Sequence, residues 1–224
     1  MTIAEGSIQD RRRDVLVLGI GNILWADEGF GSRAAEMFNQ RYADIEGVEC
    51  ADGGTLGFYL INLITSSRRI LVFDCCDFRE KPGTMKVLRK DDIVIWLSTK
   101  ISPHQTGLSD LLAQAEILGK APEEIVVIGV QPQELNDYGG GLTPTVHACL
   151  EPAMKMAEEE LAKWGYQLKR RAPGEKVQPL MDRSVEETPY VSGRPSSEEA
   201  CRDGDERFMV RQAGTRTEDP NNEF

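Results

Sequence analysis

The stretch that decides the fold is Val15-Leu16-Val17-Leu18-Gly19-Ile20-Gly21-Asn22-Ile23-Leu24-Trp25-Ala26-Asp27-Glu28-Gly29-Phe30-Gly31. Its apolar first part has strand length and ends at two glycines. Two acids then open a segment whose apolar residues recur at helical spacing, so the stretch predicts a strand, a turn and a helix. In open α/β sheets, ligand sites form beyond the carboxyl ends of the parallel strands, where this reading places Asp27 and Glu28. Acids in a first helical turn also complement the helix dipole, so the stretch alone leaves a purely structural role open.

The same strand-to-helix pattern recurs along the chain. Further strands are predicted at 48–51, 70–74 and 125–130, with an edge strand at 84–88, and helices are predicted at 29–42, 56–64, 108–118 and 144–164. The predicted fold is a three-layer α/β domain over residues 14–168. It has a mostly parallel, twisted sheet, helices on both faces and one antiparallel edge strand.

The two ends of the chain differ from this domain. Residues 1–13 are polar and are expected to form a flexible N-terminus. From residue 169 to residue 224, prolines and glycines alternate with charged residues and aromatic residues are few. Such a composition buries too little apolar surface to offset the entropy lost on ordering, so it predicts a low-complexity, mostly disordered tail.

Composition excludes several classes of function. The 224 residues carry a net charge of −11, which argues against nucleic acid as the main partner, because phosphate binding needs clustered Lys and Arg. The sequence shows no signal peptide and no apolar run of the roughly 20 residues that a bilayer span requires. We therefore expect a cytoplasmic protein without membrane insertion. The five cysteines are odd in number and form no CxxC pair, so no disulfide framework is indicated.

Common catalytic and nucleotide-binding motifs are absent. A GxGxxG fingerprint that starts at Gly19 would need glycine at position 24, where Leu24 stands. No GxxxxGK[ST], GxSxG or HExxH motif occurs, so we expect no nucleotide cofactor and neither a serine-hydrolase elbow nor a zinc-protease helix.

Three acids and one histidine remain as candidate site residues. Glu28, Asp52 and Asp74 follow or end the first three strands, and His104 precedes the helix at 108–118. In a parallel sheet these positions converge on one rim, where two carboxylates and one imidazole would suit Ni, Zn, Fe(II) or Mn with positions left for water or substrate. A lone loop histidine is more often structural, so both readings stay open at this point. His147, inside the predicted helix 144–164, is expected to be a packing residue.

Five ordered motifs together resemble the nickel-iron hydrogenase maturation endopeptidases, from about Val15 to Gly165. They are Gly19-Ile20-Gly21-Asn22-Ile23-Leu24 with Asp27-Glu28-Gly29, Asp52-Gly53-Gly54-Thr55, Asp74, Ile101-Ser102-Pro103-His104-Gln105 and Gly141-Leu142-Thr143-Pro144. The resemblance implies a protease that removes the C-terminal extension of the [NiFe] hydrogenase large subunit precursor after nickel insertion. It also implies that Glu28, Asp74 and His104 contact nickel carried by the substrate.

The chemistry of cleavage stays open at this stage. Water could be polarised by the metal or by a carboxylate, so the enzyme could be metal-dependent or of the aspartyl type, with Glu28 and Asp74 as catalytic acids and Asp52 as a candidate base. A self-contained zinc peptidase is one rival interpretation. A non-catalytic metal-binding chaperone of the hydrogenase precursor is the other.

Overall fold

The computed structural model describes residues 13–55, 60–89, 92–93 and 106–195 of the chain. The fold presented below lies in the first of two compact units, Met1–Val191, and the second unit is Ser192–Phe224. No helix in these described ranges is long and apolar enough to cross a bilayer.

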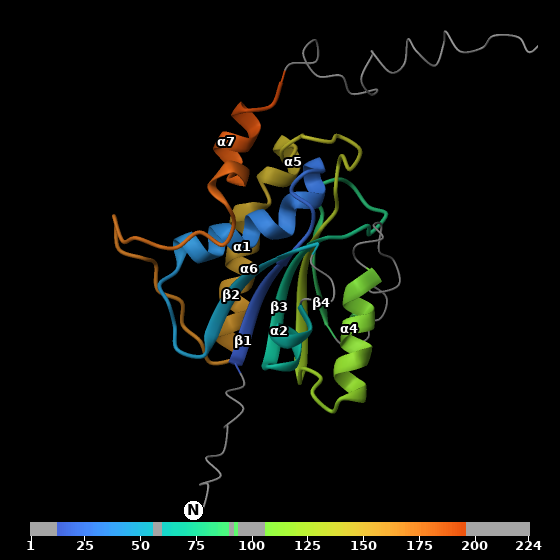
Figure 1. Cartoon of the computed structure of the whole chain (residues 1–224), viewed down its shortest axis with the longest axis vertical. Coiled ribbons are helices and arrows are strands. Elements are labelled where there is room, and N and C mark those ends of the chain that lie inside the picture. The colour runs from blue at the N-terminus through green and yellow to red at the C-terminus, as the bar shows by residue number, and fades with distance from the viewer. Residues whose placement is uncertain (1–12, 56–59, 90–91, 94–105, 196–224) are drawn as a thin grey trace, which may run out of the picture. The chain divides into compact units, whose positions relative to one another are not determined.

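A five-stranded sheet forms the middle layer (Figure 1). Its order is β2-β1-β3-β5-β4, and all neighbouring strands are parallel except β4, which pairs antiparallel with β5 at one edge. The bounds are β1 Arg13–Ile20, β2 Val48–Gly54, β3 Ser67–Cys75, β4 Met85–Arg89 and β5 Glu124–Val130. The predicted sheet, including its antiparallel edge strand, is confirmed.

Helices cover both faces of the sheet. Alternate residues of each strand point to opposite faces, so β1 sends Val15 and Val17 into a core with α1 (Phe30–Arg41) and α6 (Leu150–Lys163). Its Leu16 and Leu18 enter a second core with α2 (Ile61–Thr65) and α4 (Thr106–Ile117). Because the strands are apolar on both sides, the sheet is buried between these layers. The three-layer prediction is confirmed.

The closing helix differs from its prediction. Instead of one helix over 144–164, the structure has α5 (Pro144–His147) and α6, which are separated at Ala148 and Cys149. The Thr143 side chain caps α5 by accepting from the Val146 backbone N–H, and only Val146 of α5 is buried. The prediction that His147 packs in the core is therefore wrong: its ring is exposed, with Nε2 3.3 Å from a carboxylate oxygen of Glu187.

The first part of the predicted disordered tail also differs. Residues 169–191 lie against α1, and include a short 3-10 helix at Arg183–Val185 and α7 (Glu187–Ser192). The side chain of Glu36 accepts the Leu180 N–H at 2.7 Å, and Asn39 donates to the Gln178 carbonyl at 2.9 Å. Composition missed this packing because it depends on single contacts: polar side chains of α1 bind the segment, and Leu180 packs against the α1/α6 core. Residues 196–224 of the predicted tail lie outside the described residues.

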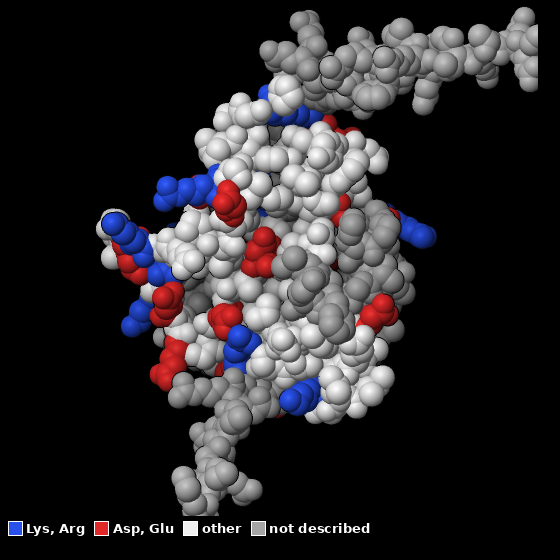
Figure 2. All heavy atoms as spheres, viewed as in Figure 1, with Lys and Arg blue, Asp and Glu red and all other residues white. Residues whose placement is uncertain are grey.

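Charged side chains are scattered over the described surface that Figure 2 shows. Lys and Arg lie among Asp and Glu on this face and do not form one broad basic patch.

Candidate active site

Asp74 ends a buried strand and is itself buried. Its Oδ1 accepts the Cys75 backbone N–H at 2.9 Å. Because Ile70 and Val72 of β3 enter the α2/α4 core, strand alternation puts the Asp74 side chain on that same face of the sheet. The helix α4, which follows His104 in sequence, covers this face; His104 itself lies outside the described residues.

Glu28 lies in a 3-10 turn, η1 (Ala26–Gly29), between β1 and α1. Its backbone N–H donates to the Trp25 carbonyl at 2.9 Å, and its carbonyl accepts the Asn22 N–H at 3.1 Å. A Cβ at Gly21, whose φ is +150°, would lie 2.0 Å from the Glu28 carbonyl oxygen. The glycine at the end of the first strand therefore lets the turn that carries Glu28 close onto β1.

Several carboxylates affect the thiol of Cys75, the last residue of β3. Burial is the main reason that the pKa of the Cys75 thiol lies well above its usual range, and the charges of Asp74, Asp27, Glu28 and Asp77 raise it further. Glu28 and Asp74 thus act electrostatically on the same neighbour. Asp74 lies near the carboxyl end of β3, and Glu28 lies in the turn that follows β1.

Gly31 allows the start of α1 to pack closely on the sheet. A Cβ at Gly31 would lie 2.0 Å from the Ile20 carbonyl oxygen and 2.3 Å from that of Phe73. The first turn of α1 therefore lies directly on the ends of β1 and β3, which no side chain at this position would permit. A glycine-rich turn can also bind a phosphate group, but the close packing explains this glycine.

Asp52 occupies a separate position. Its Oδ1 accepts the Ser32 hydroxyl at 2.6 Å and the Gly54 N–H at 3.0 Å, so its side chain is directed towards α1. Asp52 pairs in register with Gly19 of β1. Asp74 lies on β3, on the other side of β1, so the two backbones are about 10 Å apart, which is two strand spacings. The structure therefore places the Asp52 and Asp74 side chains on opposite faces of the sheet.

Asp27 has a structural role. The sequence pattern alone could not distinguish such a role from a catalytic one. It is fully buried, and its carboxylate accepts four hydrogen bonds of 2.7 to 3.1 Å from the loop that follows β5. The donors are the backbone N–H groups of Gln133, Glu134 and Thr143 and the Thr143 hydroxyl. Asp27 therefore fixes the turn that presents Glu28.

Cysteine chemistry is not available at this rim. Burial raises the pKa of the Cys50, Cys75 and Cys149 thiols, and Cys76 is also buried. These thiols stay protonated near neutral pH and are poor nucleophiles. Cys75 and Cys76 are thus small residues of the buried core.

A complete metal site is not formed by the described residues alone. Within them, no group of three His, Cys, Asp or Glu side chains is placed to hold a metal ion. Of the three ligands that the sequence predicts, Glu28 and Asp74 are described, and His104 lies outside the described ranges.

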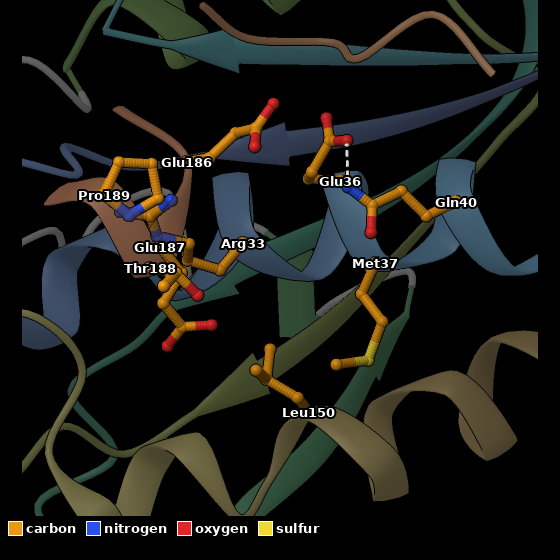
Figure 3. A pocket seen from close by; sticks show the side chains of 9 residues that line it. All are labelled: Arg33, Glu36, Met37, Gln40, Leu150, Glu186, Glu187, Thr188 and Pro189. Atoms are coloured by element: carbon orange, nitrogen blue, oxygen red, sulfur yellow. Dashed lines mark hydrogen bonds between the residues drawn. The ribbon is translucent and has the colours of Figure 1, made fainter. Parts of the chain in front are cut away.

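A pocket of about 260 Å³ lies elsewhere, between α1, Leu150 of α6 and the segment 186–189 (Figure 3). Its polar groups are partly satisfied by each other, since the Gln40 amide donates to Glu36 at 2.7 Å. None of the predicted site residues lines it, so it is not the candidate active site.

Comparison with known proteins identifies this arrangement. The sequence model described as HycI, hydrogenase maturation protease, matches residues 32–160. The hydrogenase expression/formation protein HupD of Thiocapsa roseopersicina is 43% identical over 93% of this chain and 95% of its own length. HoxM of Azotobacter vinelandii, with the same description, is 44% identical over 89% of this chain and 96% of its own.

Solved structures agree with the sequence relatives. The hydrogenase maturating endopeptidase HybD from Escherichia coli superposes with a TM-score of 0.67 and 38% identity, over 70% of this chain and 98% of that one. These relatives show that the chain is a hydrolase of the endopeptidase class. The chain belongs to the hydrogenase maturation protease family.

Proposed function

We propose that this protein removes the C-terminal extension of the [NiFe] hydrogenase large subunit precursor after nickel insertion. In this proposal it recognises the bound nickel through Glu28, Asp74 and His104. The observation that supports the proposal is that Glu28 follows β1 and Asp74 lies near the end of β3, in a chain that belongs to the hydrogenase maturation protease family.

The donor set suits an ion that is already partly liganded. Two carboxylates and one imidazole are too few to fill the coordination sphere of nickel, and they leave positions for ligands that the substrate supplies. The buried Asp74 is held by its own strand end and Glu28 by a hydrogen-bonded turn, so both donors are fixed in advance. Nickel in the precursor would then bring one peptide bond to a constant place on the rim.

Asp52 is our candidate for the base that activates water. Because the Ser32 hydroxyl and the Gly54 N–H both hold Oδ1, the carboxylate has a fixed orientation. Its separation from the Glu28 and Asp74 pair fits a role at the scissile bond, while the pair contacts the metal.

The test is processing of purified precursor followed on a gel. The wild-type protein is expected to shorten nickel-loaded precursor and to leave nickel-free precursor intact. Glu28→Gln, Asp74→Asn and His104→Ala should each abolish shortening, while Glu116→Gln, at an exposed acid on α4, should leave it unchanged. A His104→Ala protein that trims normally would refute nickel recognition by this set.

Two further outcomes identify the rival interpretations. Stoichiometric zinc in the purified protein, together with cleavage of nickel-free precursor, would establish a self-contained metallopeptidase. Binding of the precursor without any shortening would instead establish a chaperone, and would contradict the proposed cleavage.

A further inference from the structure

An exposed apolar patch lies beside the turn that carries Glu28. It consists of Leu24, Trp25 and Tyr138, whose exposed fractions are 37%, 36% and 62%. The Trp25 and Tyr138 rings meet edge to face with centroids 5.2 Å apart, and the Gly139 N–H donates to the Leu24 carbonyl at 2.8 Å. We call these three residues the aromatic patch. Exposed clusters of large apolar side chains mark interaction sites, and Trp and Tyr are the residues most enriched in binding hot spots.

The patch is built into the candidate site. The Trp25 carbonyl accepts the Glu28 N–H, so the indole and the carboxylate belong to one short turn. Between them Ala26 is buried with a φ of +40°, a conformation that costs a non-glycine residue free energy. Hydrogen bonds on both sides, from Trp25 N–H to Asn22 and from Asp27 N–H to Glu134, hold this strained residue in place. These bonds hold Trp25 in the same turn as Glu28.

Size and charge indicate what covers the patch. Three side chains are far fewer than the roughly 20 residues per partner of a standard protein interface, so the patch suits a short chain segment better than a dimer. Glu134 and Asp137 lie in the same loop as Tyr138, and the whole chain has a net charge of −11, so a second copy would bring like charges together. Trp25 and Glu28 belong to one hydrogen-bonded turn, so a molecule bound at Glu28 lies close to the patch.

We propose that the aromatic patch docks an apolar segment of the substrate polypeptide, immediately next to the part of the substrate that reaches Glu28. This inference rests on the proposed function and adds to it a substrate-docking surface outside the nickel-contacting set. Trp25 and Tyr138 contribute affinity for the polypeptide, and the carboxylates act on the metal and the peptide bond.

The test is steady-state processing of nickel-loaded precursor by full-length variants. Trp25→Ala is expected to raise KM about tenfold or more, with kcat within about twofold of wild type, and Tyr138→Ala is expected to act in the same direction. Trp25→Phe should retain most of the affinity. Ile117→Ala is the matched control, since Ile117 is 84% exposed at the far end of α4 and should leave KM unchanged.

Each result decides the inference. A normal KM for both alanine variants would overturn it, as would sedimentation showing a wild-type dimer that Trp25→Ala dissociates. If Trp25→Ala does not fold by circular dichroism, Tyr138→Ala and Trp25→Phe carry the test. If the wild-type protein binds precursor without cutting it, the proposed function fails. In that case, loss of precursor binding in Trp25→Ala would still support the docking surface. Unchanged binding in Trp25→Ala would overturn the docking surface.

Discussion

Asp27 holds Thr143 through both of its carboxylate oxygens. The Thr143 N–H donates to Oδ1 at 2.7 Å, and the Thr143 hydroxyl lies 3.1 Å from Oδ2. Residues more than a hundred positions apart in sequence are thereby joined at the rim, so the turn with Glu28 and the loop with Tyr138 form one rigid unit. The position of Glu28 depends on a loop that follows the last strand of the sheet.

Removing this link should destabilise the fold strongly. Asp27→Ala leaves three backbone N–H groups without their acceptor in a buried place, so we expect the free energy of unfolding to fall by about 3 kcal/mol or more. Urea unfolding followed by circular dichroism measures the change. Glu28→Ala, at the neighbouring and more exposed carboxylate, is the control and should cost less than about 1 kcal/mol. Equal stability of the two variants would contradict the role of Asp27.

Ser32 should support the reaction through Asp52. The buried Ser32 hydroxyl donates to Asp52 at 2.6 Å, so Ser32→Ala is expected to lower kcat about tenfold and to leave KM for the precursor unchanged. In an Asp52→Asn background the same change should have little further effect, because it acts through the carboxylate that is already lost. Additive losses in the double variant would separate Ser32 from Asp52.

The buried thiols should be inert in the native protein. With the pKa values of Cys50, Cys75 and Cys149 raised, their thiolate fraction at pH 7.5 is far below that of a free cysteine, so iodoacetamide should not modify them. Mass spectrometry before and after unfolding in urea checks this. Processing activity should be unaffected by the reagent. Loss of activity together with modification of Cys75 would reopen a thiol mechanism.

The segment 169–191 should come away from α1 when its polar anchors are removed. Arg33 donates to the Val185 carbonyl at 2.5 Å, and its guanidinium lies 5.7 Å from the centroid of the Tyr190 ring. Arg33→Leu is therefore expected to accelerate tryptic cleavage after Arg183 at least severalfold, with little change in the Tm of the domain. Glu36→Gln, which keeps an acceptor for the Leu180 N–H, should be cut more slowly than Arg33→Leu. Unchanged cleavage of both would argue that these contacts do not hold the segment.

The beginning of β1 should make stability depend on pH. The Tyr166 hydroxyl, followed by Arg68 and Arg69, holds the pKa of Asp14 below its ordinary value of 3.8. A carboxyl whose pKa is lowered by folding stabilises the protein above its unfolded pKa, and this contribution is lost as the pH falls through the folded value. Asp14→Asn should therefore lower the urea midpoint at pH 7 and lose this effect towards pH 3. A constant difference between the two pH values would exclude the charged form of Asp14 as the cause.

The sheet could be predicted because its signal is local. Runs such as Ile70 to Asp74 are apolar on both sides and end in an acid, which only a strand buried between two layers explains. The predicted closing helix is too long, because neither Ala148 nor Cys149 is a residue type that marks the end of a helix. The break between α5 and α6 therefore leaves no signal at these two positions. His147 was misassigned for the same reason, since its exposure follows from the short α5 and not from its neighbours in sequence.

The site could be predicted only in part. Glu28 and Asp74 can be found from the predicted strand ends. That Asp52 lies on the other face of the sheet from Asp74 follows only from the strand order β2-β1-β3 and from the contact with Ser32. The structural use of Asp27 depends on a loop far along the chain, which helical spacing cannot reveal. Likewise, the packing of residues 169–191 comes from single polar contacts with Arg33 and Glu36, which leave no periodic trace.

The close approach at Gly31 also bears on how a saturation library of this gene should be read. A screen for abundance alone would already recover only glycine there, since a single methyl group would collide with two carbonyl oxygens. Intolerance at that codon therefore carries no information about proteolysis. Glu28 is the opposite case. If Glu28 variants accumulate normally and yet leave the precursor uncut, the residue is required for cleavage and not for folding.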